Sequence, residues 1–325
     1  MSYRNILLAL SLSLSCTAQA AICPDYQTPQ QAPTAPLPAK KSFKHFGNTI
    51  LAGIYSPWHM VHDSLVAEGQ YPYLVGKFDY DALLHKDLED ERVHVYLFGT
   101  GMQNWEYLGS RITDSDGKIA MTLQPRPAGD YRVRMVVEGD RSSVDGWLTV
   151  VERGRQAVLF DVDGTLTIND FEAYADYVGV KTATPYYYAP QTVRAYQDKG
   201  YQILYLTARP YWVTRDGREW FGKQNLPAWH YRSNPYGDGP IPPNTVEHKA
   251  NYVRYLRDTV GLNIIRAYGN ATTDIEAYAA GGMPKADTWI IGEHAGKEGT
   301  QALSGDYALH YSTVVNGTPP AACKR

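Results

Sequence analysis

Short apolar runs alternate with amphipathic stretches through the second half of the chain. Four runs are rich in β-branched or aromatic residues and bounded by polar ones, which predicts buried strands: 157–160, 202–206, 264–268 and 288–291. Four stretches between or beside them predict helices: 190–199, 212–223, 247–258 and 273–280. Strands that alternate with helices form a parallel sheet with right-handed crossovers. We therefore expect an α/β, Rossmann-like domain over residues 153–318.

The first half has a different pattern. Residues 43–152 read as short alternating segments separated by polar turn sequences, which predicts a small antiparallel β-sandwich. The acidic turn at Asp114 and Asp116 favours an Asp-Gly hairpin turn over a calcium site. His59, His62 and Asp63 lack the partners of a metal cluster. We expect this domain to position a partner, without chemistry of its own.

The ends of the chain differ from both domains. Residues 1–20 place Arg4 before an apolar run and end in a small-x-small sequence, which predicts a signal peptide cleaved after Ala20 and a periplasmic or secreted protein. Lipidation at Cys16 is an alternative, although Ser13 stands where Leu is expected. Residues 21–42, rich in Pro, Gln, Ala and Thr, predict a flexible leader, and 319–325 a tail.

Cysteine count and composition add two expectations. Removal of residues 1–20 leaves Cys23 and Cys323, an even pair that we hypothesise forms a disulfide. The 325 residues are 44% hydrophobic and 20% charged, with a net charge of −3, which allows two domains with real cores. Mild acidity argues against a nucleic-acid partner and limits any membrane contact to a local surface.

Two carboxylates, Asp161 and Asp163, directly follow the strand at 157–160. Side chains two positions apart on a strand point to the same side, so both can face one reacting group. Mg²⁺ is the cation that suits such a pair, since it prefers a few carboxylates with water and phosphate oxygens. Gly164 allows a tight turn through which the backbone approaches a phosphate. An EF-hand loop would need its glycine two positions later.

Three further polar groups follow in order along the chain. Thr207, Ala208 and Arg209 come where the strand at 202–206 ends, Lys249 opens a helix, and Asn270 and Asp274 follow the strand that ends at Tyr268. Each group alone is ordinary, because a Thr after a strand is usually a helix cap and a helical Lys is usually solvated. Four groups in sequence, each at the end of a strand or the start of a helix, predict one shared site.

This series resembles the four motifs of the haloacid dehalogenase (HAD) phosphohydrolase superfamily. The resemblance implies that Asp161 is a nucleophile, that Asp163 exchanges protons with the leaving group, and that Lys249 neutralises charge. It further implies phosphate binding by Gly164, Thr207, Ala208, Arg209 and Lys249. Mg²⁺ would be held by Asp161, Asp163, Asn270 and Asp274. The intervals between motifs leave room for no large cap, so we expect an open site.

The sequences of three motifs, DVDGTLT, LTARP and GNATTDIEAY, resemble those of the lipin phosphatidate phosphatases. The chain is still more similar to the C-terminal domain of the membrane-associated phosphatidylinositol transfer proteins, over roughly residues 75–315. The animal members of that family lack the nucleophilic Asp and bind phosphatidic acid without cleaving it, whereas Asp161 is present here. We therefore expect a Mg²⁺-dependent phosphatase that hydrolyses a phosphomonoester, such as phosphatidate, through an aspartyl phosphate.

Three other functions remain open at this point. One is a broad-specificity acid phosphatase, a second is a phosphatidic-acid-binding module without turnover, and a third is an interaction protein that acts through its β-sandwich. The aromatic sequence at Tyr186, Tyr187 and Tyr188, together with Trp229 and Tyr231, suits either a lipid interface or core packing, and we favour packing.

Overall fold

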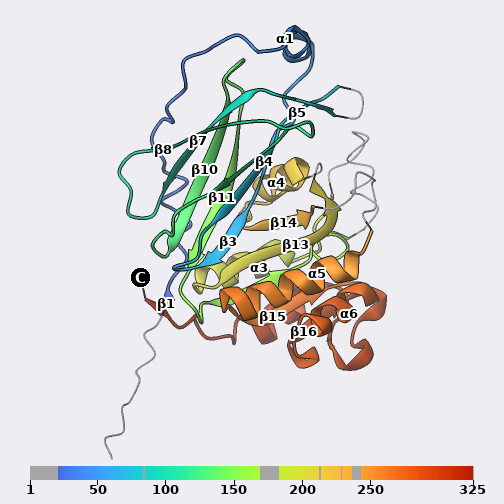
Figure 1. The fold of residues 1–325 in the computed structure, drawn as a ribbon. Coiled ribbons are helices and arrows are strands. Elements are labelled where there is room, and N and C mark those ends of the chain that lie inside the picture. The colour runs from blue at the N-terminus through green and yellow to red at the C-terminus, as the bar shows by residue number, and fades with distance from the viewer. Residues whose placement is uncertain are drawn as a thin grey trace, which may run out of the picture.

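Two β-rich domains follow one another along the chain (Figure 1). The computed structural model describes residues 21–82, 85–168, 183–211, 214–227, 229–235 and 243–324. The signal peptide expected at 1–20 lies outside these residues. Within the described ranges, no helix is both long enough and apolar enough to cross a membrane.

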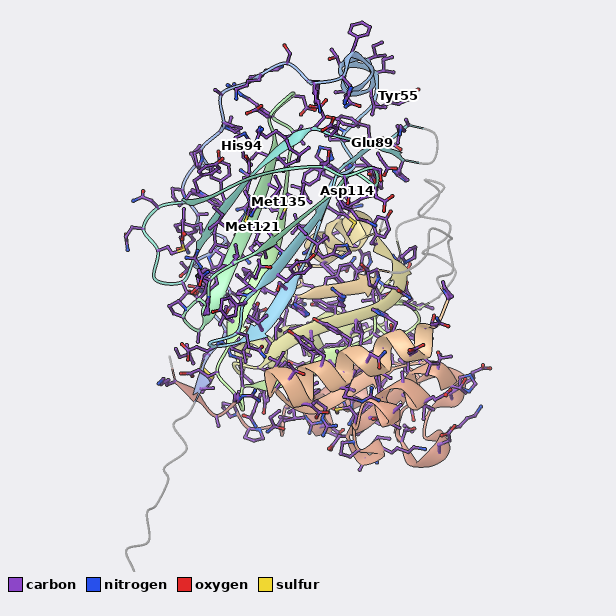
Figure 2. All side chains as sticks on the ribbon, in the orientation of Figure 1. Tyr55, Glu89, His94, Asp114, Met121 and Met135 are labelled. Carbon is purple, nitrogen blue, oxygen red and sulfur yellow. A yellow bond between two sulfur atoms is a disulfide. The ribbon has the colours of Figure 1, made fainter. Side chains whose placement is uncertain are left out.

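The first domain is a β-sandwich. One sheet has the order β3-β11-β10-β7-β8 and the other the order β2-β4-β9. Their bounds are β2 Met60–His62, β3 Ser64–Ala67, β4 Tyr73–Lys77, β7 Arg92–Gly99, β8 Glu106–Ile112, β9 Lys118–Thr122, β10 Gly129–Val137 and β11 Ser143–Val151. The pairings are antiparallel except for β3 with β11. Met121 and Met135, labelled in Figure 2, come from different sheets and are both buried in the core between them.

The acidic turn after β8 is a turn, but it does not close a hairpin. Asp114 Oδ1 accepts the backbone N–H groups of Asp116 at 2.9 Å and Lys118 at 2.8 Å. Because β8 and β9 belong to different sheets, this turn carries the chain across the sandwich. The hairpin expectation is wrong here, since sequence turn signals do not say which sheet the next strand joins.

The second domain is built on a six-stranded parallel sheet of order β14-β13-β12-β15-β16-β17. Its strands are β12 Gln156–Phe160, β13 Gln202–Pro210, β14 Tyr231–Asn234, β15 Asn263–Gly269, β16 Thr288–Ile291 and β17 Gln301–Leu303. Its α-helices are α3 Ala189–Asp198, α4 Thr214–Lys223, α5 Thr245–Arg254, α6 Thr272–Ala280 and α7 Ala308–His310. The alternation of strand and helix seen in the sequence therefore holds in the structure.

One expected helix is α-helical at its start and π-helical at its end. The helix expected at 247–258 begins as α5 and continues as a π-helical stretch, Tyr255–Val260, that ends at Gly261 with φ of 82°.

The remaining elements are short: β1 Ala21–Ile22, α1 Phe46–Ile54, β5 Asp79–Tyr80, β6 Lys86–Asp87, β18 Cys323–Lys324, a second π-helical stretch, Tyr311–Val315, and the 3-10 helices Lys285–Asp287, Gly292–His294 and Lys297–Gly299.

The leader at 21–42 is not loose along its whole length. Tyr26 is buried, and its hydroxyl donates to the carbonyl of Tyr201 at 3.0 Å and accepts the N–H of Ile203 at 2.9 Å. A disulfide joins Cys23 to Cys323, with a Cα–Cα distance of 4.9 Å. The segment expected to be flexible thus contributes a side chain to the core of the α/β domain.

Asp63 joins the two domains. Its Oδ1 accepts the N–H of Trp147 in the sandwich at 2.9 Å and a guanidinium N–H of Arg218 in α4 at 2.6 Å. Its Oδ2 accepts the N–H of Tyr231 in β14 at 2.7 Å. The rings of Trp147 and Trp229 pack beside this junction, with centroids 4.1 Å apart. The sandwich is therefore fixed to the edge of the parallel sheet by buried polar and aromatic contacts.

Candidate functional site

Three neighbouring strands bring the motif residues to one edge of the parallel sheet. Asp161 follows β12, Thr207 and Arg209 lie in the last part of β13, and Asn270 follows β15. In the sheet, β12 lies between β13 and β15, so the carboxyl ends of these strands are adjacent. Gly164 has a φ of 66°, a left-handed conformation that favours glycine, as the tight turn expected there requires.

Lys249 connects two carboxylates from different elements. Its Nζ lies 2.7 Å from Oδ1 of Asp161 and 2.7 Å from Oδ1 of Asp274. Lys249 is supplied by α5 and Asp274 by the first turn of α6, and all three side chains are buried. The other oxygen of Asp274 accepts the backbone N–H groups of Asn270 and Ala271, which fixes the start of α6. The ammonium thus binds an anionic pair that burial would otherwise destabilise.

Burial controls the electrostatics of Asp161. Removal from water raises its pKa to about 7, because desolvation outweighs the opposing attraction of Lys249, and Asp274 and Asp163 add repulsion. The same ion pairs raise the pKa of Lys249 against the effect of its burial, so its positive charge is kept. A buried carboxyl beside a permanent cation is the kind of arrangement found at functional sites.

Asp163 faces the residues of β13. Its Oδ2 accepts the hydroxyl of Thr207 at 3.0 Å, and its Oδ1 forms an ion pair with the guanidinium of Arg209. Thr207 Oγ1 in turn accepts the backbone N–H of Arg209 at 3.1 Å. Two residues expected to bind phosphate therefore bind the second motif carboxylate. Ala208 lies between them on the same strand.

Thr165 is a member of the site that the sequence reasoning did not single out. Its hydroxyl lies 2.8 Å from Oδ2 of Asp161 and 3.2 Å from Oδ1 of Asn270. Its carbonyl accepts the hydroxyl of Tyr307 at 3.0 Å. Thr165 stands within the DGT sequence, so the motif itself held the signal. Tyr307 is 142 residues away along the chain and gave none.

The donor set suits Mg²⁺ in part. Asp161 Oδ2 and Asn270 Oδ1 both lie within hydrogen-bond distance of the Thr165 hydroxyl, and oxygen atoms are the ligands that Mg²⁺ prefers. Of the other two expected ligands, Asp163 is paired with Arg209, and Asp274 is bound by Lys249 and backbone N–H groups. Among the described residues, no three His, Cys, Asp or Glu side chains form a metal-binding cluster.

Comparison with known proteins identifies both domains. Residues 57–150 match the β-sandwich domain of PITM 1-3, and residues 158–292 match the LNS2 domain of PITM 1-3. The chain thus carries two consecutive domains of the PITM 1-3 family. Membrane-associated phosphatidylinositol transfer protein 1 of Homo sapiens is 32% identical over 268 residues, which is 80% of this chain and 20% of that protein.

Two further relatives show the same coverage. Membrane-associated phosphatidylinositol transfer protein 3 of Homo sapiens is 32% identical over 79% of this chain and 26% of its own length. Protein retinal degeneration B of Drosophila melanogaster is 30% identical over 81% of this chain and 21% of its own length. The chain therefore spans about a fifth to a quarter of the length of these curated relatives.

These relatives correct three expectations. The function expected from the motifs, a secreted or periplasmic Mg²⁺-dependent phosphatase, is wrong, because the related proteins are named as phosphatidylinositol transfer proteins. The alternative of a broad-specificity acid phosphatase is wrong for the same reason. The periplasmic or secreted location is wrong as well, because these proteins are named as membrane-associated. The motif residues lie together at the strand ends, but residue types alone do not distinguish turnover of a phosphate from its binding.

Proposed function

We propose that this chain binds the phosphorylated head group of a membrane lipid at the strand-end site, with phosphatidic acid as the simplest ligand, and does not hydrolyse it. The lipid part of the proposal is supported by the names of the relatives, which transfer a phospholipid. The phosphate part is supported by the hydroxyl of Thr207, the guanidinium of Arg209 and the turn at Gly164. Arginine and backbone N–H groups are preferred partners of phosphate oxygens.

The arrangement around Asp161 supports an anion site: both oxygens of its carboxylate bind side chains that are themselves fixed in the site. Lys249 binds Oδ1 and the hydroxyl of Thr165 binds Oδ2, each within 2.8 Å. A carboxylate oxygen has two lone pairs, so one hydrogen bond to each oxygen leaves Asp161 able to accept a further ligand. Its ion pair also keeps Lys249 charged and fixed at the edge of the site. Binding without turnover is favoured by the names of the relatives, which describe the transfer of a lipid.

Binding would proceed by exchange of anions on Arg209. The guanidinium pairs with Asp163, and the side chains of both are partly exposed, at 14% and 17%. A dianionic phosphate is a stronger acceptor than one carboxylate, so it would replace Asp163 on Arg209 and Thr207. We further infer that the sheet is of the HAD type and that Mg²⁺ binds Asp161 and Asn270, where it would offset the added negative charge.

Helix α1 supplies a surface for membrane contact. Phe46, Ile50 and Ile54 recur at intervals of four residues, so they share one face of the helix, and they are 77%, 46% and 68% exposed. Leu51 and Ala52 pack against the sandwich core. The helix lies at the end of the sandwich away from the α/β domain (Figure 1). Apolar side chains displayed in this way insert into the boundary between head groups and acyl chains.

The test is cosedimentation of the full chain with phosphatidylcholine vesicles, with or without phosphatidic acid. We expect preferential binding to the vesicles that carry phosphatidic acid. Arg209→Gln should reduce that preference about tenfold, since one charge-assisted contact is lost. Arg92→Gln, an exposed arginine of the sandwich, is the matched control and should bind like the wild type.

Two further measurements decide between binding and turnover and locate the membrane contact. Release of inorganic phosphate from the vesicles by the wild type, lost in Asp161→Asn, would overturn the proposal. Phe46→Asp should weaken binding to both kinds of vesicle without removing the preference for phosphatidic acid. EDTA should weaken only the preference, because Mg²⁺ is inferred to act at the phosphate site.

A further inference from the structure

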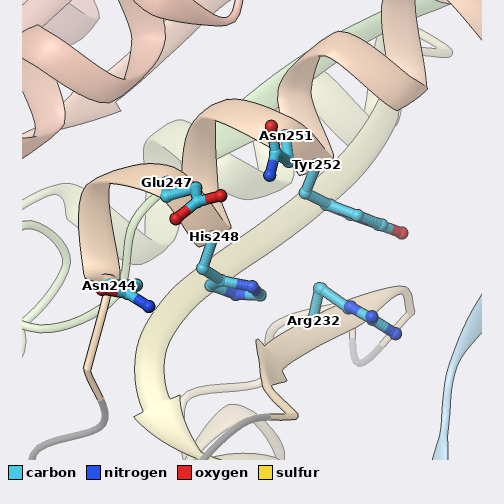
Figure 3. A pocket seen from close by; sticks show the side chains of 6 residues that line it. All are labelled: Arg232, Asn244, Glu247, His248, Asn251 and Tyr252. Atoms are coloured by element: carbon cyan, nitrogen blue, oxygen red, sulfur yellow. The ribbon is translucent and has the colours of Figure 1, made fainter.

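A second pocket lies beside the strand-end site, between the start of α5 and strand β14. It encloses about 310 Å³, which is at the small end for a site that binds a small molecule. Its lining comprises Arg232, Asn244, Glu247, His248, Asn251 and Tyr252. Figure 3 shows the imidazole of His248 between helix α5 and the side chain of Arg232 from β14. His248 is adjacent in sequence to Lys249, so α5 serves both the pocket and the strand-end site.

His248 presents an unused hydrogen-bond acceptor there. The residue is only 7% exposed, and within the described part of the chain its Nε2 has no hydrogen-bond partner. The imidazole also hydrogen-bonds to the backbone of Thr207. That bond must come from Nδ1, which acts as the donor to the carbonyl, so Nε2 carries the lone pair. Burial, with Arg232 and Lys249 nearby, lowers the pKa of His248 to about 4, which keeps the ring neutral.

The pocket holds one charge of each sign. Across the described residues, neither Arg232 nor Glu247 forms an ion pair, although both line the same small space. The guanidinium of Arg232 lies over the ring of Tyr252, 5.0 Å from its centroid, and its Nε is a buried donor without a partner. Asn251 uses its Oδ1 to accept Arg254. The pocket therefore offers donors and acceptors side by side.

The charges and hydrogen-bonding groups of the pocket together determine which class of ligand it can bind. A phosphate would be repelled by Glu247 and would find no donor on the neutral His248. A quaternary or primary ammonium would be repelled by Arg232. A hydroxyl group both donates and accepts, so a ring or chain with several hydroxyls can satisfy His248 Nε2, Glu247 and Arg232 together.

We propose that this pocket binds the polyol part of a ligand whose phosphate occupies the adjacent strand-end site. The inference rests on the proposed function for the phosphate, but the pocket itself is defined by groups that the strand-end site does not use. The ligand is thus a polyol phosphate, either as a lipid head group or as a soluble ester. A buried, unpartnered acceptor is costly unless a ligand satisfies it, and this supplies the affinity.

The experiment is calorimetric titration of the full chain with inositol 1-phosphate, ethyl phosphate and free myo-inositol. His248→Asn is the decisive variant, because its amide keeps a donor where Nδ1 stands and lacks an acceptor at Nε2. Glu247→Gln removes the carboxylate charge, and Glu276→Gln, an exposed position on α6, is its matched control. Inositol 1-phosphate should bind about tenfold tighter than ethyl phosphate, which has no hydroxyl group, since it adds hydrogen bonds to buried and charged groups.

The variants should abolish this difference and leave the affinity for ethyl phosphate unchanged, while Glu276→Gln should behave like the wild type. Equal affinities for the two esters in the wild type would overturn the polyol pocket and leave the phosphate site standing. If neither ester binds, the proposed function fails, and the pocket then stands only if myo-inositol binds and His248→Asn weakens it. Displacement of inositol 1-phosphate by phosphatidylinositol vesicles would assign the polyol to a lipid, and no displacement to a soluble ester.

Discussion

Asp63 in the sandwich and Asp161 in the α/β domain are buried to the same extent, at 3% exposure each, yet their partners differ in kind. Asp63 accepts two backbone N–H groups and one arginine, so two of its partners belong to the fixed chain. Asp161 accepts a lysine and a threonine side chain. Side-chain partners can change rotamer when a ligand arrives, whereas backbone partners cannot. A buried carboxylate therefore marks a candidate site by what it is bonded to and where it stands.

A buried lysine in each domain shows the same contrast. In the sandwich, the buried Lys77 pairs with Asp79 and Asp87 within the domain. In the α/β domain, Lys249 pairs with two carboxylates at the carboxyl edge of a parallel sheet, beside groups that line an open pocket. The first arrangement stabilises a loop, and the second stands where α/β sheets place ligands.

The largest effect should follow removal of the cation from the strand-end site. Lys249→Met leaves two buried carboxylates without their partner, so the free energy of unfolding should fall by about 3 to 5 kcal/mol. Urea denaturation measures this loss. Adding Asp161→Asn and Asp274→Asn should recover much of it. Lys285→Met, which breaks an exposed pair with Glu298, is the control, and an equal loss there would remove the distinction.

Asp161 should give the α/β domain a characteristic pH dependence. Its folded pKa, about 7, lies above its ordinary value of 3.8, so between these values the folded state holds a proton that the unfolded state has lost. Stability from this group is therefore greatest below pH 3.8 and declines as pH rises, by up to about 1.4 kcal/mol per pH unit. Asp161→Asn should flatten the profile of unfolding free energy against pH in this range. An unchanged profile would contradict the assignment.

Asp63→Ala should separate the domains without touching the strand-end site. It removes the acceptor of two backbone N–H groups and one acceptor of Arg218, for an expected loss of about 3 kcal/mol. Limited proteolysis should then cut between the domains more readily, and the fragments separate once the Cys23–Cys323 disulfide is reduced. Thermal unfolding is the second measurement. Asp116→Ala, whose carboxylate is 68% exposed, is the control. Equal behaviour of the two variants would show that Asp63 does not hold the junction.

The smallest effect belongs to an exposed ion pair of the sandwich. Arg126 binds Glu106 through two hydrogen bonds of 2.6 and 2.8 Å, but the partners are 21% and 41% exposed. Arg126→Ala should cost less than about 1 kcal/mol and still less in high salt, because water and ions screen the pair. Thermal unfolding at two salt concentrations checks this. A loss comparable to that of Asp63→Ala would mean that burial does not separate the two classes of carboxylate.

The sequence predicted the strands, the helices and the placement of Asp161, Thr207, Lys249 and Asn270 because each depends on local periodicity and on the order of elements. It did not predict Asp63 as a domain junction, since its partner Tyr231 is 168 residues away. Trp229 and Tyr231 prove to be buried and Tyr187 is 64% exposed, a division that depends on which surfaces meet in the fold.

The pocket around His248 was missed for a related reason. Its helix contributes residues on a face that carries no recognisable motif, and Arg232 comes from a separate strand. The expectation of turnover failed differently: the motif residues lie together at the strand ends, but the relatives are named for the transfer of a lipid. Sequence order predicted that these residues lie together and could not predict what they do.

The bond between Cys23 and Cys323 spans 300 positions of the chain. It closes the chain between these residues, which includes both domains, into one covalent loop. A force applied at Ala21 and Lys324 would therefore pass across the two sulfur atoms and bypass the sheets of both domains. Neither domain would carry a load until that bond is reduced.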